Sequence, residues 1–146
     1  MVMQRFSDFW SAEKSITEDI FFAPSAGHTD TFIFDEVGFV GENCDGIYVT
    51  GDYNCRTGSM AVNFQIKGVG AIRRYCLGGL AHKDVGRYHE HIMQKESDVA
   101  PGSNLPFAID RLDFVELTPK VAWLKICQEA KIAHTADFKD PEEWCK

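Results

Sequence analysis

The sequence of 146 residues contains no long hydrophobic run. Its longest apolar stretches, such as residues 19–24 and 31–34, are far shorter than the roughly 20 residues that a helix needs to cross a bilayer. The N-terminal residues also lack the charged, apolar and small-residue segments of a signal peptide. We therefore expect no membrane span and a cytoplasmic protein.

The sequence also lacks any C-x-x-C pair among its five cysteines. The spacing typical of zinc knuckles and dithiol redox centres is therefore absent. The odd number of five leaves at least one thiol unpaired, and we expect all of them to be reduced. Cys127 falls in a helical pattern and Cys76 in a strand pattern, where small buried hydrophobic side chains are expected.

Positive charge is also in short supply, with 15 basic against 22 acidic residues and a net charge of −7. This balance excludes a general nucleic-acid coat, which depends on lysine and arginine to neutralise phosphates. The charge is uneven, however. Residues 1–66 hold three basic and ten acidic groups, whereas residues 67–95 hold six basic and two acidic groups. A local basic region could therefore receive a phosphate.

The hydrophobic pattern predicts one α+β domain over residues 1–146. Helical spacing marks residues 2–14, and a capping threonine followed by proline marks a second helix start at Thr118. Between them, strands are expected at 19–24, 30–40, 46–50, 60–67 and 71–77, with a turn at 51–58 and an exposed loop at 95–105. The result is an antiparallel strand meander flanked by an N-terminal and a C-terminal helix, with a loosely attached tail at 134–146.

Three of the five histidines fall within residues 81–93. Side chains two apart in a strand share a face, so His89 and His91 should project together, roughly 6.5 to 7 Å apart. His82 precedes them in a loop. Imidazole can donate or accept a proton near neutral pH, and its neutral form binds metals. This stretch is the candidate functional site.

Several motifs are distributed through the second half of the chain, about residues 70–132. They are the run from Arg74 to Gly79, Ala81-His82, Gly86, His89-x-His91-Ile92, Leu105-Pro106 and residues 113–132. This pattern resembles a family of small bacterial and phage proteins, and similar histidine arrangements occur in small TumE-type toxins. The resemblance implies an RNA-directed activity that uses His82, Gly86, His89 and His91. Lys83-Asp84-Val85 departs from the family's Asn-Pro-Asp, and Cys76 stands where the family has an acidic residue.

The first functional hypothesis is accordingly a toxin-like nuclease that cleaves RNA phosphodiesters without a metal or other cofactor. One histidine would abstract the ribose 2′-hydroxyl proton and another would protonate the leaving oxygen. The residues expected to act in catalysis are His82, His89, His91 and Arg87. Those expected to bind the substrate are Arg73, Arg74, Lys83 and Tyr88.

Two other hypotheses remain open beside a purely structural role for the histidines. The pattern His89-x-His91-x4-Glu96 is similar to the first metal-binding motif of cupins, so His89, His91 and Glu96, or Asp84 in place of Glu96, could hold a divalent metal. The second cupin motif is missing, because no histidine lies near Pro101-Gly102. Alternatively, the acidic first half could make the chain a phage or bacterial inhibitor that engages a nucleic-acid-processing protein.

Overall fold

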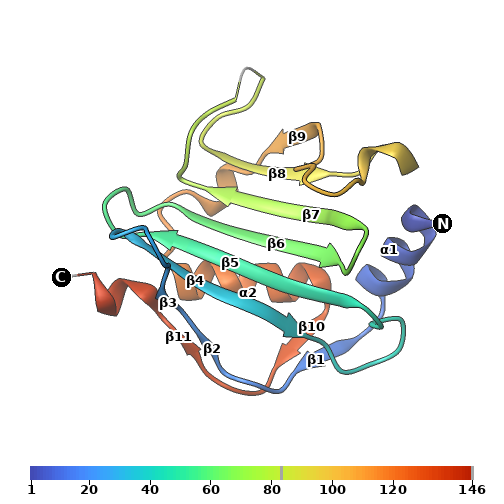
Figure 1. The fold of residues 1–146 in the computed structure, drawn as a ribbon, viewed down its shortest axis with the longest axis horizontal. Coiled ribbons are helices and arrows are strands. Elements are labelled where there is room, and N and C mark those ends of the chain that lie inside the picture. Colours follow the sequence, from blue (N-terminus) through green and yellow to red (C-terminus); the bar gives the residue numbers. More distant parts are fainter. Residues whose placement is uncertain (83, 146) are drawn as a thin grey trace.

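The computed structural model describes residues 1–82 and 84–145 and is built on a seven-stranded antiparallel sheet. The strands follow one another in chain order, so the sheet is a meander, as the sequence predicts. They are β3 (Ala23–Pro24), β4 (Thr31–Gly38), β5 (Ile47–Asn54), β6 (Met60–Ile66), β7 (Gly70–Leu77), β8 (Tyr88–Ile92) and β9 (Phe107–Asp110). Figure 1 shows this sheet face on. The α+β class is confirmed.

Both long helices, α1 (Val2–Ser11) and α2 (Pro119–Ala130), pack against the same face of the sheet. The ring of Trp123 in α2 lies 6.3 Å from that of Phe34 in β4, and Phe9 in α1 lies 6.3 Å from Phe64 in β6. Phe34 and Phe64 point to the same side of the sheet according to the strand register. Figure 1 shows α2 behind the sheet. The opposite face is therefore left without a helix among the described residues.

The start of α2 follows its sequence signal. Thr118 accepts a hydrogen bond from the backbone amide of Val121, and Pro119 occupies the first helical position. At the other end Lys131 adopts the left-handed conformation that commonly closes a helix. Backbone groups at both ends of α2 thus find hydrogen-bond partners nearby in the sequence, and the predicted helix is confirmed.

The first helix ends earlier than residue 14, where the sequence pattern places its end. Lys14 instead begins β1 (Lys14–Ile16), and its ammonium group turns back to donate to the carbonyls of Trp10, Ala12 and Ala130. These carbonyls lie at the C-terminal ends of α1 and α2, where backbone acceptors lack helical partners. A buried lysine therefore joins the two helix ends.

Residue Gly51 lies inside β5 and does not begin a turn, so the predicted turn at 51–58 is too long. Gly51 faces Phe34 directly across β4 and β5. A Cβ atom at Gly51 would lie 2.1 Å from Cε2 of Phe34. The glycine therefore makes room for an aromatic ring in the core. Because glycine is also common in turns, the sequence pattern predicts a turn at this position.

The tail at 134–146, for which the sequence suggests a loose attachment or a docking of Phe138 and Trp144, packs against the body over its described part. β10 (Ile132–His134) pairs in parallel with β1, and β11 (Phe138–Lys139) pairs in parallel with β2 (Ile20–Phe21). Phe138 is buried, and a short 3-10 helix, η3 (Pro141–Trp144), follows. Two further 3-10 turns are η1 (Glu96–Asp98) and η2 (Leu112–Phe114).

The expectation that all five cysteines are reduced is also wrong, because Cys55 and Cys145 form a disulfide. The bond joins the start of the β5–β6 turn to Cys145, which directly follows η3. Cys44, Cys76 and Cys127 are free, and Cys127 is buried as predicted. No helix in the described part of the chain is long and apolar enough to span a membrane.

Candidate metal centre

The face of the sheet that no helix covers carries two rows of side chains across the strands. Residues directly opposite one another in the ladder define the first row as Asp52, Ala61, Cys76, His89 and Asp110, running from β5 to β9. The neighbouring row follows the same strands. It consists of Thr50, Asn63, Arg74, His91 and Ala108. The strand spacing of about 4.8 Å brings adjacent members of each row into contact range.

His89 and His91 project from β8 to this open face, as the two-residue alternation predicts, and backbone carbonyls fix both rings. Nδ1 of His89 lies 2.8 Å from the carbonyl oxygen of Gly86, and Nδ1 of His91 lies 2.8 Å from that of Leu105. A carbonyl can only accept, so each imidazole donates its Nδ1–H and keeps the lone pair on Nε2. Metal-binding histidines are oriented by the same type of hydrogen bond.

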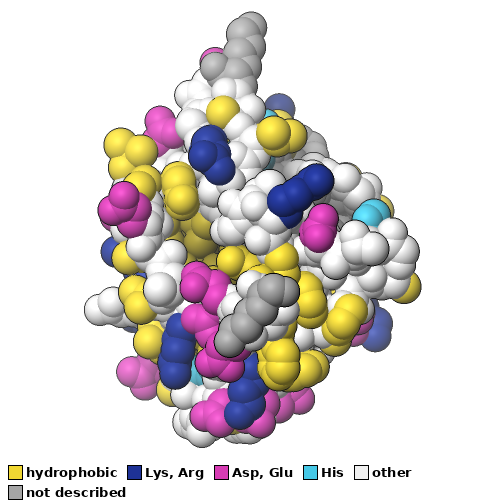
Figure 2. Space-filling view, turned by 90° about the vertical axis from the view of Figure 1, so that its left-hand side faces the viewer, with side chains coloured by type: hydrophobic (Ala, Val, Ile, Leu, Met, Phe, Trp, Pro, Cys, Tyr) yellow, Lys and Arg dark blue, Asp and Glu magenta, His cyan; other side chains and the backbone are white. Residues whose placement is uncertain are grey.

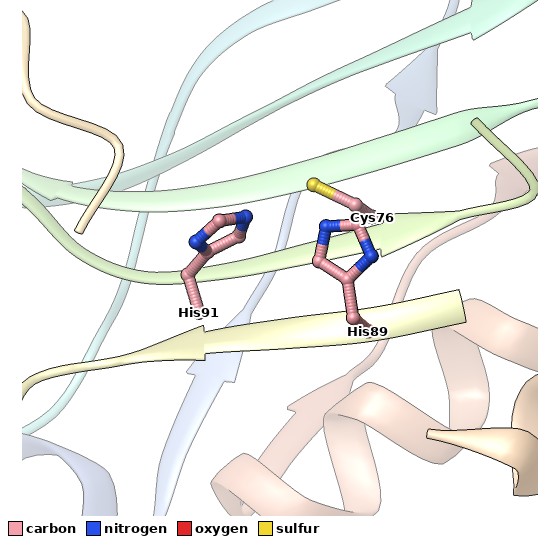
Figure 3. Close-up of side chains that lie close together, drawn as sticks. All are labelled: Cys76, His89 and His91. Carbon is pink, nitrogen blue, oxygen red and sulfur yellow. The ribbon is translucent and has the colours of Figure 1, made fainter. Parts of the chain in front are cut away.

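Cys76 completes a compact group with these two histidines. One ligand atom from each of Cys76, His89 and His91 lies within 4.8 Å of the others. Figure 3 shows the two rings rising from β8 on the side of the sheet to which the Cys76 sulfur projects from β7. Nε2 of His89 is buried without a described hydrogen-bond partner. A thiol and two imidazoles thus converge, with at least one lone pair left unused.

His82 brings a third imidazole to the group from the loop between β7 and β8. Its ring centre lies 4.5 Å from that of His89 and 5.3 Å from that of His91. Its side chain is exposed, whereas His89 and His91 are 1% and 6% exposed. The three histidines predicted from the sequence therefore do come together, with His82 on the solvent side.

Burial controls the protonation of the group. It lowers the pKa of His89 and of His91, because desolvation penalises the imidazolium, and the backbone hydrogen bonds offset only part of this. Burial also raises the pKa of the Cys76 thiol, while the nearby Arg74 acts in the opposite direction. Nε of Arg74 donates to Sγ of Cys76 at 3.3 Å. The two histidines are therefore held neutral. The thiol keeps its proton unless a cation with a higher affinity for the sulfur displaces it.

Two hollows adjoin this group from different sides. One, of about 600 Å³, lies between the His82 loop and residues 97–108 and is lined by His82, His91 and Asn104. The other, of about 280 Å³, lies over the sheet and reaches Asp52, Arg74 and all three histidines. The cluster is consequently placed between two spaces that a small molecule can enter.

Several residues expected in the site have other partners. Arg87 donates to the carbonyls of Gly78 and Gly79 and so braces its own loop. Arg73 and Tyr88 point to the opposite, helix-covered face, where Arg73 pairs with Glu90 at 2.6 Å. Arg73 and Tyr88 therefore cannot contact a ligand held by the histidines. Lys83 lies outside the described residues.

The predicted third metal ligand, Glu96, also lies elsewhere. Its carboxylate accepts hydrogen bonds from the backbone amides of Val2 and Met3 at 2.8 and 3.0 Å, where it satisfies the N-terminus of α1. The group that converges with His89 and His91 contains Cys76 in its place. Asp84, the other carboxylate considered, is exposed and lines the larger hollow.

Two supporting residues were not found from the sequence. Asp110 accepts a hydrogen bond from the amide of Gly86 at 2.8 Å, which positions the carbonyl that binds His89. Leu105 has a φ of 65°, a conformation that leucine rarely adopts, and its carbonyl binds His91. Strained residues of this kind gather at functional sites. Both roles depend on contacts between strands and loops that no local pattern encodes.

The surface at one end of the molecule carries charges of both signs. Figure 2 shows acidic and basic side chains interspersed there, with apolar side chains between them. That face offers no continuous field of one sign, in contrast to the uneven charge along the sequence.

Comparison with known proteins adds no family to this description. The chain matches no protein-family model, no curated protein and no solved structure.

Proposed function

We propose that this protein binds a single divalent transition-metal ion, Zn²⁺, through Cys76, His89 and His91, and uses it to activate water for hydrolysis. The observation that carries the proposal is the convergence of the three ligand atoms within 4.8 Å around the unpartnered Nε2 of His89. A buried polar atom without a partner is costly, and a metal ion would remove that cost.

The ligand types favour zinc. A thiolate and two neutral imidazoles suit Zn²⁺, whereas Mg²⁺ and Ca²⁺ prefer carboxylate and carbonyl oxygens. The lowered pKa values of His89 and His91 keep both rings in the neutral form that binds metal. The hydrogen bonds of their Nδ1 atoms supply the outer support typical of zinc histidines.

Three protein ligands would leave the fourth tetrahedral position to water, which is the arrangement of catalytic zinc sites. Zinc lowers the pKa of such a water to about 7 and so provides a nucleophile at neutral pH. His82, whose ring centre lies 4.5 Å from that of His89 and 5.3 Å from that of His91, would be the residue to exchange with that water or to relay its proton. The two adjoining hollows would admit a substrate.

The test is a zinc titration against a chromogenic chelator. We expect one zinc ion per wild-type chain, and a loss of affinity of about 100-fold or more in Cys76→Ala, His89→Ala and His91→Ala. His28→Ala is the control for histidine removal, because His28 is exposed and distant in sequence, and Cys127→Ala is the control for thiol removal. Stoichiometric binding that survives all three ligand substitutions would refute the proposal.

Metal-independent ribonuclease activity stays a second candidate, favoured by the meeting of His82, His89 and His91. The roles expected of Arg73 in substrate binding and of Arg87 in catalysis gain no support, because Arg73 pairs with Glu90 and Arg87 donates to backbone carbonyls of its own loop. RNA cleavage by metal-free protein, unaffected by a chelator and lost in His89→Ala, would favour it over the zinc hydrolase. The inhibitor hypothesis, which needs an acidic surface, gains no support from the mixed charges in Figure 2.

A further inference from the structure

Arg74 is the positively charged residue of the open face nearest to the proposed ligands. It lies directly opposite His91 in the ladder between β7 and β8, and its Nε donates to Sγ of Cys76. Its terminal nitrogens, Nη1 and Nη2, make no hydrogen bond or ion pair with the residues that the structure describes. The end of the guanidinium group is therefore available to a ligand.

The smaller hollow lies where that free end can be reached. Arg74, Cys76 and His91 all line it. Ala61 stands between Asp52 and Cys76 in its cross-strand row, and its small side chain leaves space above the sheet. The volume of about 280 Å³ is enough for a small anionic group beside the ligand cluster.

We propose that this hollow binds an oxyanion, the phosphoryl or carboxylate group of the substrate, between the metal ion and Arg74. This inference rests on the proposed metal centre. One oxygen would take the open position on the metal, and two others, or the second carboxylate oxygen, would accept hydrogen bonds from Nη1 and Nη2. The planar fork of arginine matches two phosphoryl oxygens in a bidentate manner, and its two Nη groups can also converge on the one free oxygen of a carboxylate.

The charge of Asp52 should also influence anion binding in this hollow. It lines the same hollow and interacts electrostatically with Arg74, but it does not form an ion pair with Arg74 in the described structure. A negative charge at Asp52 opposes an incoming anion. Removing the charge should therefore strengthen oxyanion binding, while removing the charge of Arg74 should weaken it.

The experiment uses full-length protein loaded with Co²⁺, whose visible spectrum responds to a change of ligand. Inorganic phosphate and acetate are titrated separately into the wild type, Arg74→Lys, Arg74→Met and Asp52→Asn. Arg56→Met is the matched control, because Arg56 is exposed on the β5–β6 turn. Metal loading of each variant is confirmed first from its cobalt absorption.

We expect at least one of the two anions to bind the wild type and the control equally. Arg74→Lys should bind it about tenfold more weakly and Arg74→Met more weakly still, whereas Asp52→Asn should bind it more tightly. Which anion binds distinguishes a phosphoryl from a carboxylate substrate. Equal affinity in wild type and Arg74→Met, or a cobalt-loaded protein that responds to neither anion, would overturn this inference alone. A protein that takes up no cobalt would instead refute the metal centre.

Discussion

Cys76 and His89 lie directly opposite each other on β7 and β8, and both side chains point to the open face of the sheet. His91 lies two residues further along β8, on the same face. The antiparallel register alone thus assembles three metal-binding side chains from two strands. Sites held by regular strands are more rigid than sites held by loops.

The first prediction concerns the pH dependence of zinc binding. Burial raises the pKa of the Cys76 thiol, so zinc must displace a proton to bind there at neutral pH. His89 and His91 have lowered pKa values and are already neutral. We expect the apparent affinity to rise about tenfold per pH unit between pH 7 and 8. In Cys76→Ser this rise should be nearly lost; an identical slope in both proteins would contradict the role of the thiolate.

A second prediction concerns the ion pairs on the helix-covered side of the same strand. The buried carboxylate of Glu90 accepts hydrogen bonds from Arg73 at 2.6 Å and from Arg111 at 2.7 Å. Glu90→Gln would leave Arg73 without its counter-charge and would remove one of the three carboxylates around Arg111, which keeps Asp113 and Glu129. We expect the free energy of unfolding to fall by about 3 to 5 kcal/mol in urea denaturation.

The matched control for Glu90 is an exposed ion pair. Asp137 pairs with Lys139 at 3.0 Å, with the two side chains 72% and 44% exposed. Asp137→Asn should leave the free energy of unfolding close to that of the wild type, because water screens an exposed pair. Equal effects of the two substitutions would show that burial does not govern the Glu90 pairs.

A third prediction follows from the contact between Gly51 and Phe34. A methyl group at Gly51 would overlap the Phe34 ring, since its Cβ would lie 2.1 Å from Cε2. Gly51→Ala should therefore lower the free energy of unfolding by about 1 to 3 kcal/mol. Gly38→Ala is the control, because nothing lies within 4 Å of a Cβ built there. Calorimetric unfolding of the two variants measures the difference, and a neutral Gly51→Ala would be inconsistent with this packing.

A fourth prediction uses the buried lysine between the helix ends. Burial lowers the pKa of Lys14 to about 8, from an ordinary value of 10.5. Between these pH values the unfolded chain still holds the proton that the folded chain has lost. The free energy of unfolding contributed by Lys14 therefore rises with pH across this window and is constant below it.

Lys14→Met isolates that contribution. We expect the stability of the wild type relative to Lys14→Met to increase by about 1 to 3 kcal/mol between pH 7.5 and pH 10.5. Urea denaturation of both proteins at the two pH values gives the difference directly. A difference that stays constant or shrinks with pH would mean that Lys14 keeps its ordinary pKa in the folded protein.

Local sequence patterns predict the elements whose signals are local. The alternation of Met60, Val62, Phe64 and Ile66 gives β6 and its buried face, and all four side chains are buried. Thr118 and Pro119 mark the start of α2 correctly. The sharing of a face by His89 and His91 is likewise confirmed. Each of these depends on residues within a few positions of one another.

The remaining features depend on contacts between distant segments. The two-residue alternation along β7 places Cys76 on the same face as Arg74, but the long connection between β7 and β8 hides the register that sets Cys76 opposite His89. β10 and β11 are too short to show a period, and they pair with strands near the other end of the chain. Local patterns therefore reveal neither Cys76 as the third proposed ligand nor the strand pairing of the tail.

The most direct test of the metal centre is the absorption spectrum of the cobalt-substituted protein. Cobalt bound by a thiolate gives an intense charge-transfer band in the near ultraviolet, and tetrahedral cobalt absorbs strongly in the visible. We predict both features in the wild type and in His28→Ala, and loss of the charge-transfer band in Cys76→Ser. Absence of the band from the wild type, or its persistence in Cys76→Ser, would contradict the assignment of Cys76, His89 and His91 as the metal site.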